Sequence, residues 1–150
     1  MPIPELFLDS SVLMAGICSS QGVSRVLLLL SEDKKIRITI SEQVIIEVER
    51  NIARKIPKIL SYAREMILQS QIKIVRDPSK MDVFQHLDWI SHPADVPILV
   101  AEANAKTEYL VTLNTKHFLD NPQVALRAGL RIGTPGDALK WLRERFQEDI

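Results

Sequence analysis

Four polar side chains are the residues of this chain best suited to carry chemistry. Three are carboxylates and the fourth is an amide: Asp9, Glu47, Asp95 and Asn114. Clustered carboxylates raise one another's pKa unless a cation lies between them. A divalent ion removes that repulsion, and ligand sets made of oxygens suit hard cations such as Mg²⁺ or Mn²⁺. If these side chains meet in space, the chemistry that they favour is metal-assisted.

Histidine and cysteine offer no competing pattern in the sequence, because their spacing is not that of a zinc site. His86 falls on a predicted helix and His92 on a turn, so we expect both side chains to be solvated. His117 follows Asn114 closely, where it could contact a phosphate, but a capping or surface role is the more ordinary one. The carboxylate missing at position 114 could instead come from Asp120.

The elements that must position these residues alternate along the chain. The predicted strands are the β-branched runs 6–8, 36–40, 72–75, 109–113 and 130–132. The predicted helices lie at 12–17, 23–34, 42–54, 57–70, 80–90, 95–106 and 136–147. Strands that alternate with helices predict a single α/β domain over 1–150, with a central parallel sheet flanked by helices. A parallel sheet brings the carboxyl ends of its strands to one edge, so the four side chains are predicted to converge there.

Each of the four also has an ordinary structural explanation. Asp9 can end a strand and cap the helix that follows it. Asp95 stands at a predicted N-cap, and Asn114 after a strand is commonly a turn residue. Glu47 follows three apolar residues and must find a partner or a metal, or reach solvent. Only the order of the four along one chain favours a shared site.

Composition limits the class of protein. The chain of 150 residues is 46% hydrophobic, and 19 basic residues balance 19 acidic ones. This balance argues against a strongly electropositive, non-specific nucleic-acid binder. The single Cys18 lies in an apolar run, where we expect a buried thiol in a reducing compartment. The apolar stretches are too short for a membrane span and the N-terminus lacks a secretory signal, so we expect a cytoplasmic protein.

Three stretches give the sequence a resemblance to a known family. They are Asp9-Ser10-Ser11-Val12-Leu13, "SEQVIIEVERNI" around Glu47, and "ADVPILVAEANAKTEYLVTLNTKHF" from Asp95 past Asn114. In this order they resemble the acidic motifs of the PIN-domain family, small α/β metal-dependent ribonucleases that include VapC-type toxins. The closing stretch "GLRIGTPGDALKWL" resembles the final strand and helix of that family. The resemblance implies a three-layer PIN-like domain.

The resemblance also implies roles for individual residues. Asp9, Glu47 and Asp95 would bind the metal, Ser11 and Thr112 would support them, and Asn114 would complete the catalytic set. Asn114 departs from the commonest pattern, which has an aspartate at that position, and this departure puts a second metal ion in doubt. The implied reaction is hydrolysis of RNA phosphodiester bonds with Mg²⁺ or Mn²⁺ as cofactor.

Partners follow from the same resemblance and from two predicted helices, 42–54 and 57–70, which have no strand between them. Their basic side chains could follow an RNA backbone or form a solvated face, with Arg50 and Arg54 as candidate RNA contacts beside His117. Segments 23–34 and 57–70 are rich in Leu and Ile, which predicts a homodimer. The family further implies an antitoxin as a protein partner.

Two other functions compete with the nuclease. A PIN-like scaffold could bind RNA or protein without cleaving, because Asn114 brings no charge. A response-regulator-like or phosphatase-like domain could use Asp9, but Ser11 stands where such a site needs a second acid. The three retained acids favour the enzyme.

Overall fold

The fold is described from a computed structural model in which residues 2–90, 92–119, 129 and 131–148 are placed. Asp120, which could supply the carboxylate missing at position 114, lies outside these described residues.

The described residues form five strands in one parallel sheet, in the order β3-β2-β1-β4-β5. The strands are Glu5–Leu8 (β1), Arg37–Ser41 (β2), Lys73–Val75 (β3), Tyr109–Val111 (β4) and Ile132–Gly133 (β5). The predicted α/β class and its parallel sheet are confirmed, and each strand overlaps one predicted run. Strands β1 and β4 correspond to the first and fourth predicted runs, and they pair directly with each other.

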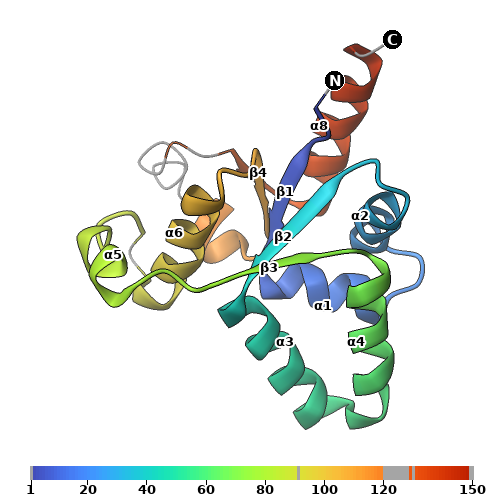
Figure 1. The fold of residues 1–150 in the computed structure, drawn as a ribbon, viewed down its shortest axis with the longest axis horizontal. Coiled ribbons are helices and arrows are strands. Elements are labelled where there is room, and N and C mark those ends of the chain that lie inside the picture. The colour runs from blue at the N-terminus through green and yellow to red at the C-terminus, as the bar shows by residue number, and fades with distance from the viewer. Residues whose placement is uncertain (1, 91, 120–128, 130, 149–150) are drawn as a thin grey trace.

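Helices flank this sheet on both sides (Figure 1). They are Ser10–Cys18 (α1), Val23–Glu32 (α2), Glu42–Lys55 (α3), Leu60–Gln69 (α4), Lys80–Gln85 (α5), Val96–Ala105 (α6) and Pro135–Glu148 (α8). Short turns of helix cover Pro57–Ile59 (η1), Pro93–Asp95 (η2) and Thr115–Leu119 (η3). In Figure 1, α5 and α6 lie on one side of the sheet and α1, α3 and α4 on the other. The helices α3 and α4, which have no strand between them, extend away from the sheet.

The core is centred on β1, where Leu6, Phe7 and Leu8 are all 0% exposed. A strand in the middle of a parallel sheet is covered on both faces, which explains its unbroken apolar sequence. Asp9 ends that run at the edge of the core. The strand therefore delivers a carboxylate to a place where apolar side chains surround it on most sides.

Local capping fixes where the helices begin. Ser41 Oγ accepts the N–H of Val44 at 3.4 Å and so caps α3. At α8, Thr134 Oγ1 accepts the N–H of Asp137, and Asp137 Oδ2 accepts the N–H of Thr134, which is a complete capping box. The helices predicted at 42–54 and 136–147 begin at Glu42 and Pro135, so the first start agrees and the second lies one residue earlier.

Two predictions on local structure are wrong. The helix predicted at 80–90 ends at Gln85; α5 buries none of its residues fully and is held by the packing of Val83 and by the hydrogen bond from Asn104 of α6 to Asp82. Cys18 is exposed rather than buried. It is the last residue of α1, about 100° around the helix from the buried Ile17, and so leaves the apolar face.

Among the residues that the structure describes, no single helix is long and apolar enough to cross a membrane. Helices α1 and α2 pass that test only together, as a pair bent by 89°.

Candidate active site

Asp9 stands where β1 ends and α1 begins, at the carboxyl edge of the sheet. Leu8 of β1 pairs with Val111 of β4, and the N–H of Asp9 donates to the Val111 carbonyl at 3.1 Å. Thr112 follows Val111 and therefore lies beside Asp9, although 103 positions separate the two in the sequence. The register of two parallel strands thus builds the first part of the site.

The Asp9 carboxylate accepts hydrogen bonds from three groups. Ser11 Oγ and the N–H of Val12 donate to Oδ1 at 2.5 Å and 3.2 Å, and Thr112 Oγ1 donates to Oδ2. The Val12 bond makes Asp9 the N-cap of α1, so its predicted capping role is confirmed. Burial raises the pKa of Asp9, and the hydrogen bonds from Ser11, Thr112 and Val12 oppose that shift.

The two hydroxyls also hold the turn that follows β4. Thr112 Oγ1 accepts the N–H of Asn114 at 2.9 Å, and Ser11 Oγ accepts the N–H of Leu113 at 3.1 Å. Each hydroxyl donates to Asp9 and accepts from this turn. Ser11 and Thr112 therefore lock the carboxylate of Asp9 and the backbone before Asn114 into one hydrogen-bonded unit.

The Asn114 side chain is directed at His117. Its Oδ1 accepts the backbone N–H of His117 at 3.1 Å, and its Nδ2 lies 3.0 Å from Nδ1 of the same residue. In this arrangement Asn114 caps the short helical segment η3 and positions the imidazole, so its predicted role as a turn residue is confirmed.

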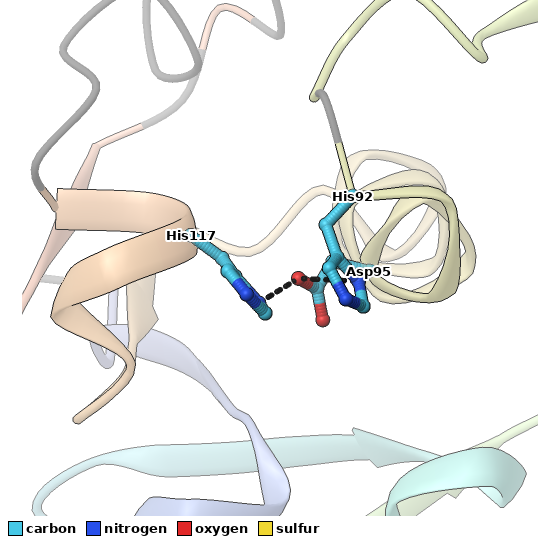
Figure 2. A group of neighbouring side chains, drawn as sticks. All are labelled: His92, Asp95 and His117. Atoms are coloured by element: carbon cyan, nitrogen blue, oxygen red, sulfur yellow. Dashed lines mark ion pairs between the residues drawn. The ribbon is translucent and has the colours of Figure 1, made fainter.

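Asp95 does not cap α6, although it stands at the N-cap position of that helix. Its side chain makes no capping hydrogen bond. Instead its Oδ2 lies 2.6 Å from His117 Nδ1 and 3.6 Å from His92 Nδ1, beside the two imidazoles (Figure 2). The prediction of a plain capping aspartate is wrong, because tertiary contacts hold this side chain away from the start of its own helix.

Charge around Asp95 acts in both directions. Burial raises the pKa of Asp95, His117 and His92 lower it, and the charge of Glu47 raises it. The charge of Glu47 on α3 thus acts on Asp95 of η2. Gln43 ties these elements together, because its Nε2 donates to Glu47 Oε1 at 3.0 Å and to the Ala94 carbonyl at 3.4 Å.

All four predicted residues thus belong to one connected set. Asp9 reaches Asn114 through Thr112, Asn114 reaches Asp95 through His117, and the charge of Glu47 acts on Asp95. The set is a chain of contacts rather than a closed ring of carboxylates. Within the described part of the protein, the one group with three ligand atoms all within 4.8 Å of one another is His92, Asp95 and His117.

The basic side chains near this set lie on α3. Arg50 and Arg54 are exposed and stand three and seven positions beyond Glu47, which places all three on one face of the helix. Arg54 donates to Asn51 Oδ1 at 3.3 Å. Arg64 of α4 is engaged with Glu49 at 2.9 Å, so it adds little free positive charge.

A family comparison decides what this arrangement belongs to. The profile of the PIN domain matches residues 5–116, which include Asp9, Glu47, Asp95 and Asn114. The chain belongs to the PIN-domain family. PIN domains are generally nucleases. No curated protein sequence matches the chain significantly.

Solved structures share the PIN fold. One is VapBC2 from Rickettsia felis bound to a DNA fragment from their promoter, with a TM-score of 0.59 at 20% identity over 87% of this chain and 98% of that one. Another is PAE2754 from Pyrobaculum aerophilum, with a TM-score of 0.62 at 13% identity over 95% of this chain and 97% of that one. At such low identity these likenesses establish the fold alone.

The sequence named His117 as a candidate contact near the site of this PIN domain, but it did not place His92 there. His92 was expected to be solvated, and its side chain is indeed 48% exposed, but it lies against Asp95. The spacing of the histidines gave no zinc pattern, because 25 positions separate His92 from His117 and only folding brings them together. A histidine three residues before a predicted site acid was the available signal.

Proposed function

We propose that this PIN domain is a metal-dependent endoribonuclease that uses Mg²⁺ or Mn²⁺. The observation that carries the proposal is the state of Asp95. Its Oδ2 is buried and has no aligned hydrogen-bond donor beside the two imidazoles, and the charge of Glu47 raises its pKa. A cation bound by both carboxylates removes their repulsion, so the pair favours a metal ion. Asp9, Glu47 and Asp95 would hold the ion.

The donor set fits such a cation, since each of the three residues offers carboxylate oxygens. When bound, a divalent ion lowers the pKa of a water molecule and stabilises the charge that develops on phosphate oxygens. Ser11 and Thr112 fix the orientation of Asp9 through their short hydrogen bonds. Asn114 orders the turn that brings His117 to Asp95.

RNA would approach along α3. Arg50 and Arg54 lie on the same face of α3 as Glu47, further along the helix. A phosphate backbone that binds at the acids and continues along this helix would therefore contact their positive charges. His117 is a further candidate contact, since its ring is 26% exposed beside Asp95. The preference for RNA over DNA rests on the resemblance to VapC-type members of the family.

Metal-dependent cleavage of a mixed RNA pool tests the proposal directly. We expect cleavage with Mn²⁺ or Mg²⁺ and none with EDTA, measured by gel electrophoresis of end-labelled RNA. A purified, folded protein that leaves the RNA intact with both ions would contradict the enzyme. Intact RNA that is nevertheless retained in a mobility-shift assay would favour a PIN-like scaffold, for which the missing carboxylate at Asn114 is the supporting observation.

Replacing Asn114 with aspartate should change the metal preference. The amide brings no negative charge, so we expect Mn²⁺ to support faster cleavage than Mg²⁺ in the natural chain, since Mn²⁺ binds mixed O/N sites more tightly. Asn114→Asp should narrow that difference by strengthening Mg²⁺ binding. Titration of activity against each ion for both proteins measures this. Unchanged curves would leave Asn114 with its capping role alone.

We further propose that this protein is the toxin of a toxin–antitoxin pair and that it cleaves RNA in the cytoplasm. Residues 1–150 would act as one PIN-like domain. The fold shared with VapBC2 supports this role. Induced expression should then arrest the growth of a bacterial host, and expression of an Asp9→Asn variant should not. Unimpaired growth with active protein in the cells would contradict a toxin.

A homodimer is expected from apolar side chains on two helices. On α2, Val26 is 36% exposed and Leu29 is 53% exposed, and on α4, Tyr62 is 46% and Leu68 77% exposed. Burying such side chains between two copies removes apolar surface from water. Light scattering at tens of micromolar should give the mass of two chains. The mass of one chain under those conditions would contradict the dimer.

A further inference from the structure

We propose that His92, Asp95 and His117 bind a divalent transition ion of the class that prefers imidazole nitrogen, such as Zn²⁺ or Co²⁺. The inference deepens the proposed function and rests on it in one respect, since Asp95 would serve both this ion and the carboxylate-bound one. It adds two nitrogen ligands that the acidic motifs do not contain. The site lies where η2 and η3 meet, next to the side chain that Asn114 holds (Figure 2).

The three ligand atoms of this cluster already lie within 4.8 Å of one another. The two imidazole rings stack with centroids 4.0 Å apart and planes 20° from parallel, so at least one ring must rotate to bring both nitrogens onto one ion. With metal–ligand bonds near 2.0–2.1 Å, neighbouring ligand atoms lie about 3 to 3.5 Å apart. The 3.6 Å between His92 Nδ1 and Asp95 Oδ2 fits this spacing, and the 2.6 Å to His117 Nδ1 needs to open by less than about 1 Å.

The imidazole Nδ1 of His117 lies near both an amide donor and a carboxylate acceptor. The backbone N–H of His117 fixes the Asn114 amide with its Oδ1 toward that N–H, so Nδ2 faces the imidazole Nδ1. A proton on Nδ1 can be donated to Asp95 Oδ2 at 2.6 Å, but the Asn114 Nδ2 donor then has no acceptor on the ring. An Nδ1 without a proton accepts from Asn114 Nδ2 and leaves Asp95 Oδ2 without a donor. Oδ2 accordingly has no aligned partner despite its close neighbours.

A metal ion resolves this conflict because it attracts the carboxylate without requiring an N–H in a fixed direction. Two neutral imidazoles and one carboxylate carry a net charge of −1, which suits a divalent ion of borderline softness better than Mg²⁺. The ion has a path to the site, since the side chains of His92 and His117 are 48% and 26% exposed. Two or more positions remain open on such an ion for water or phosphate.

Cobalt titration of the whole chain tests the proposal, with visible absorption and calorimetry as readouts. The chain has three histidines, so His86 provides a matched control outside the cluster. His86 lies beside Asp82 in a single histidine–carboxylate pair. We expect one tight Co²⁺ site with ligand-field bands, at least about tenfold weaker in His92→Ala and in His117→Ala and unchanged in His86→Ala. Excess Mg²⁺ should not displace the Co²⁺.

Nuclear magnetic resonance of the natural chain gives a second readout that needs no variant. Co²⁺ should shift or broaden the ring signals of His92 and His117 at concentrations that leave those of His86 unaltered. Equal effects on all three rings, or Co²⁺ affinity that is the same in both alanine variants as in the natural chain, would overturn the proposal. A natural chain that binds no Co²⁺ would overturn it as well and leave the cluster as an ion pair.

The Asp9→Asn variant separates this inference from the proposed function. It lies outside the cluster, so it should keep the tight Co²⁺ site while losing RNA cleavage. Loss of the Co²⁺ site with Asp9 would contradict an imidazole-based site and assign the ion to the carboxylates. Cleavage by the natural chain without imidazole-bound Co²⁺ would uphold the nuclease and overturn this inference alone.

Discussion

Asp9→Asn and Asp95→Asn should each abolish RNA cleavage while the protein stays folded. Each change removes one negative charge from the proposed ligands of the metal ion. Loss even of a residue that orients a metal ligand typically costs 10- to 100-fold, so loss of a ligand should reduce cleavage by at least about 100-fold. Rates of cleavage of one end-labelled RNA at saturating Mn²⁺ measure the effect.

The fold should survive because asparagine can reproduce the hydrogen bonds of Asp9. An amide oxygen can accept from Ser11 Oγ and the N–H of Val12, and the amide nitrogen can donate to Thr112 Oγ1 once that hydroxyl turns. Burial raises the pKa of Asp9, so a neutral side chain costs less there than the charged one. The melting temperature in metal-free buffer should therefore stay the same or rise.

A surface aspartate supplies the matched control for these variants. Asp33 is exposed at the end of α2, and Asp33→Asn makes the same chemical change away from the site. This variant should cleave RNA like the natural chain. Natural activity in either purified site variant would remove that residue from the proposed metal ligands.

The parts of this fold that the sequence predicts are those determined by local patterns. The apolar run 6–8 and the β-branched run 36–40 predict strands, and Ser41 and Thr134 carry side chains that can cap a helix. The helix predicted over 80–90 failed for the converse reason. Without a fully buried residue, α5 has little apolar packing to extend it past Gln85.

In the candidate site, too, local patterns predict some residues but not the contacts between distant segments. The acids could be found because each follows a strand or begins a helix, and a parallel sheet gathers such positions at one edge. The contact of Asp9 with Thr112 depends on the register of β1 with β4, which the two runs do not specify by themselves. The contact of His92 and His117 with Asp95 was not predicted, because neither local pattern indicates that η2 and η3 meet.

A buried acid outside the site, Glu102, should make the free energy of unfolding depend on pH. It is on α6 and is 0% exposed. Thr107 Oγ1 donates to its Oε1 at 2.7 Å, while its Oε2 is buried without a hydrogen-bond partner. Burial raises the pKa of Glu102 to about 7, from an ordinary value of 4.5. The folded protein therefore holds this proton at pH values where the unfolded chain has released it.

The sign follows from this difference in bound protons. Between pH 4.5 and about 7 the folded state binds more protons than the unfolded state, so the free energy of unfolding falls as the pH rises. The stabilisation of the folded state by the proton on Glu102 is complete below pH 4.5 and lost above about pH 7. At 1.36 kcal/mol per pKa unit, the total amounts to about 3 kcal/mol.

Glu102→Gln should remove this dependence, because the amide does not titrate. Its oxygen can still accept from Thr107 Oγ1. The free energy of unfolding of the variant relative to the natural chain should rise by about 3 kcal/mol between pH 5 and pH 8. Urea unfolding at several pH values measures that difference, and the constant cost of an unpartnered amide cancels from it. Glu65→Gln, at an exposed position on α4, is the matched control and should follow the natural chain at every pH. Parallel curves for Glu102→Gln and the natural chain would show that Glu102 does not titrate in this range.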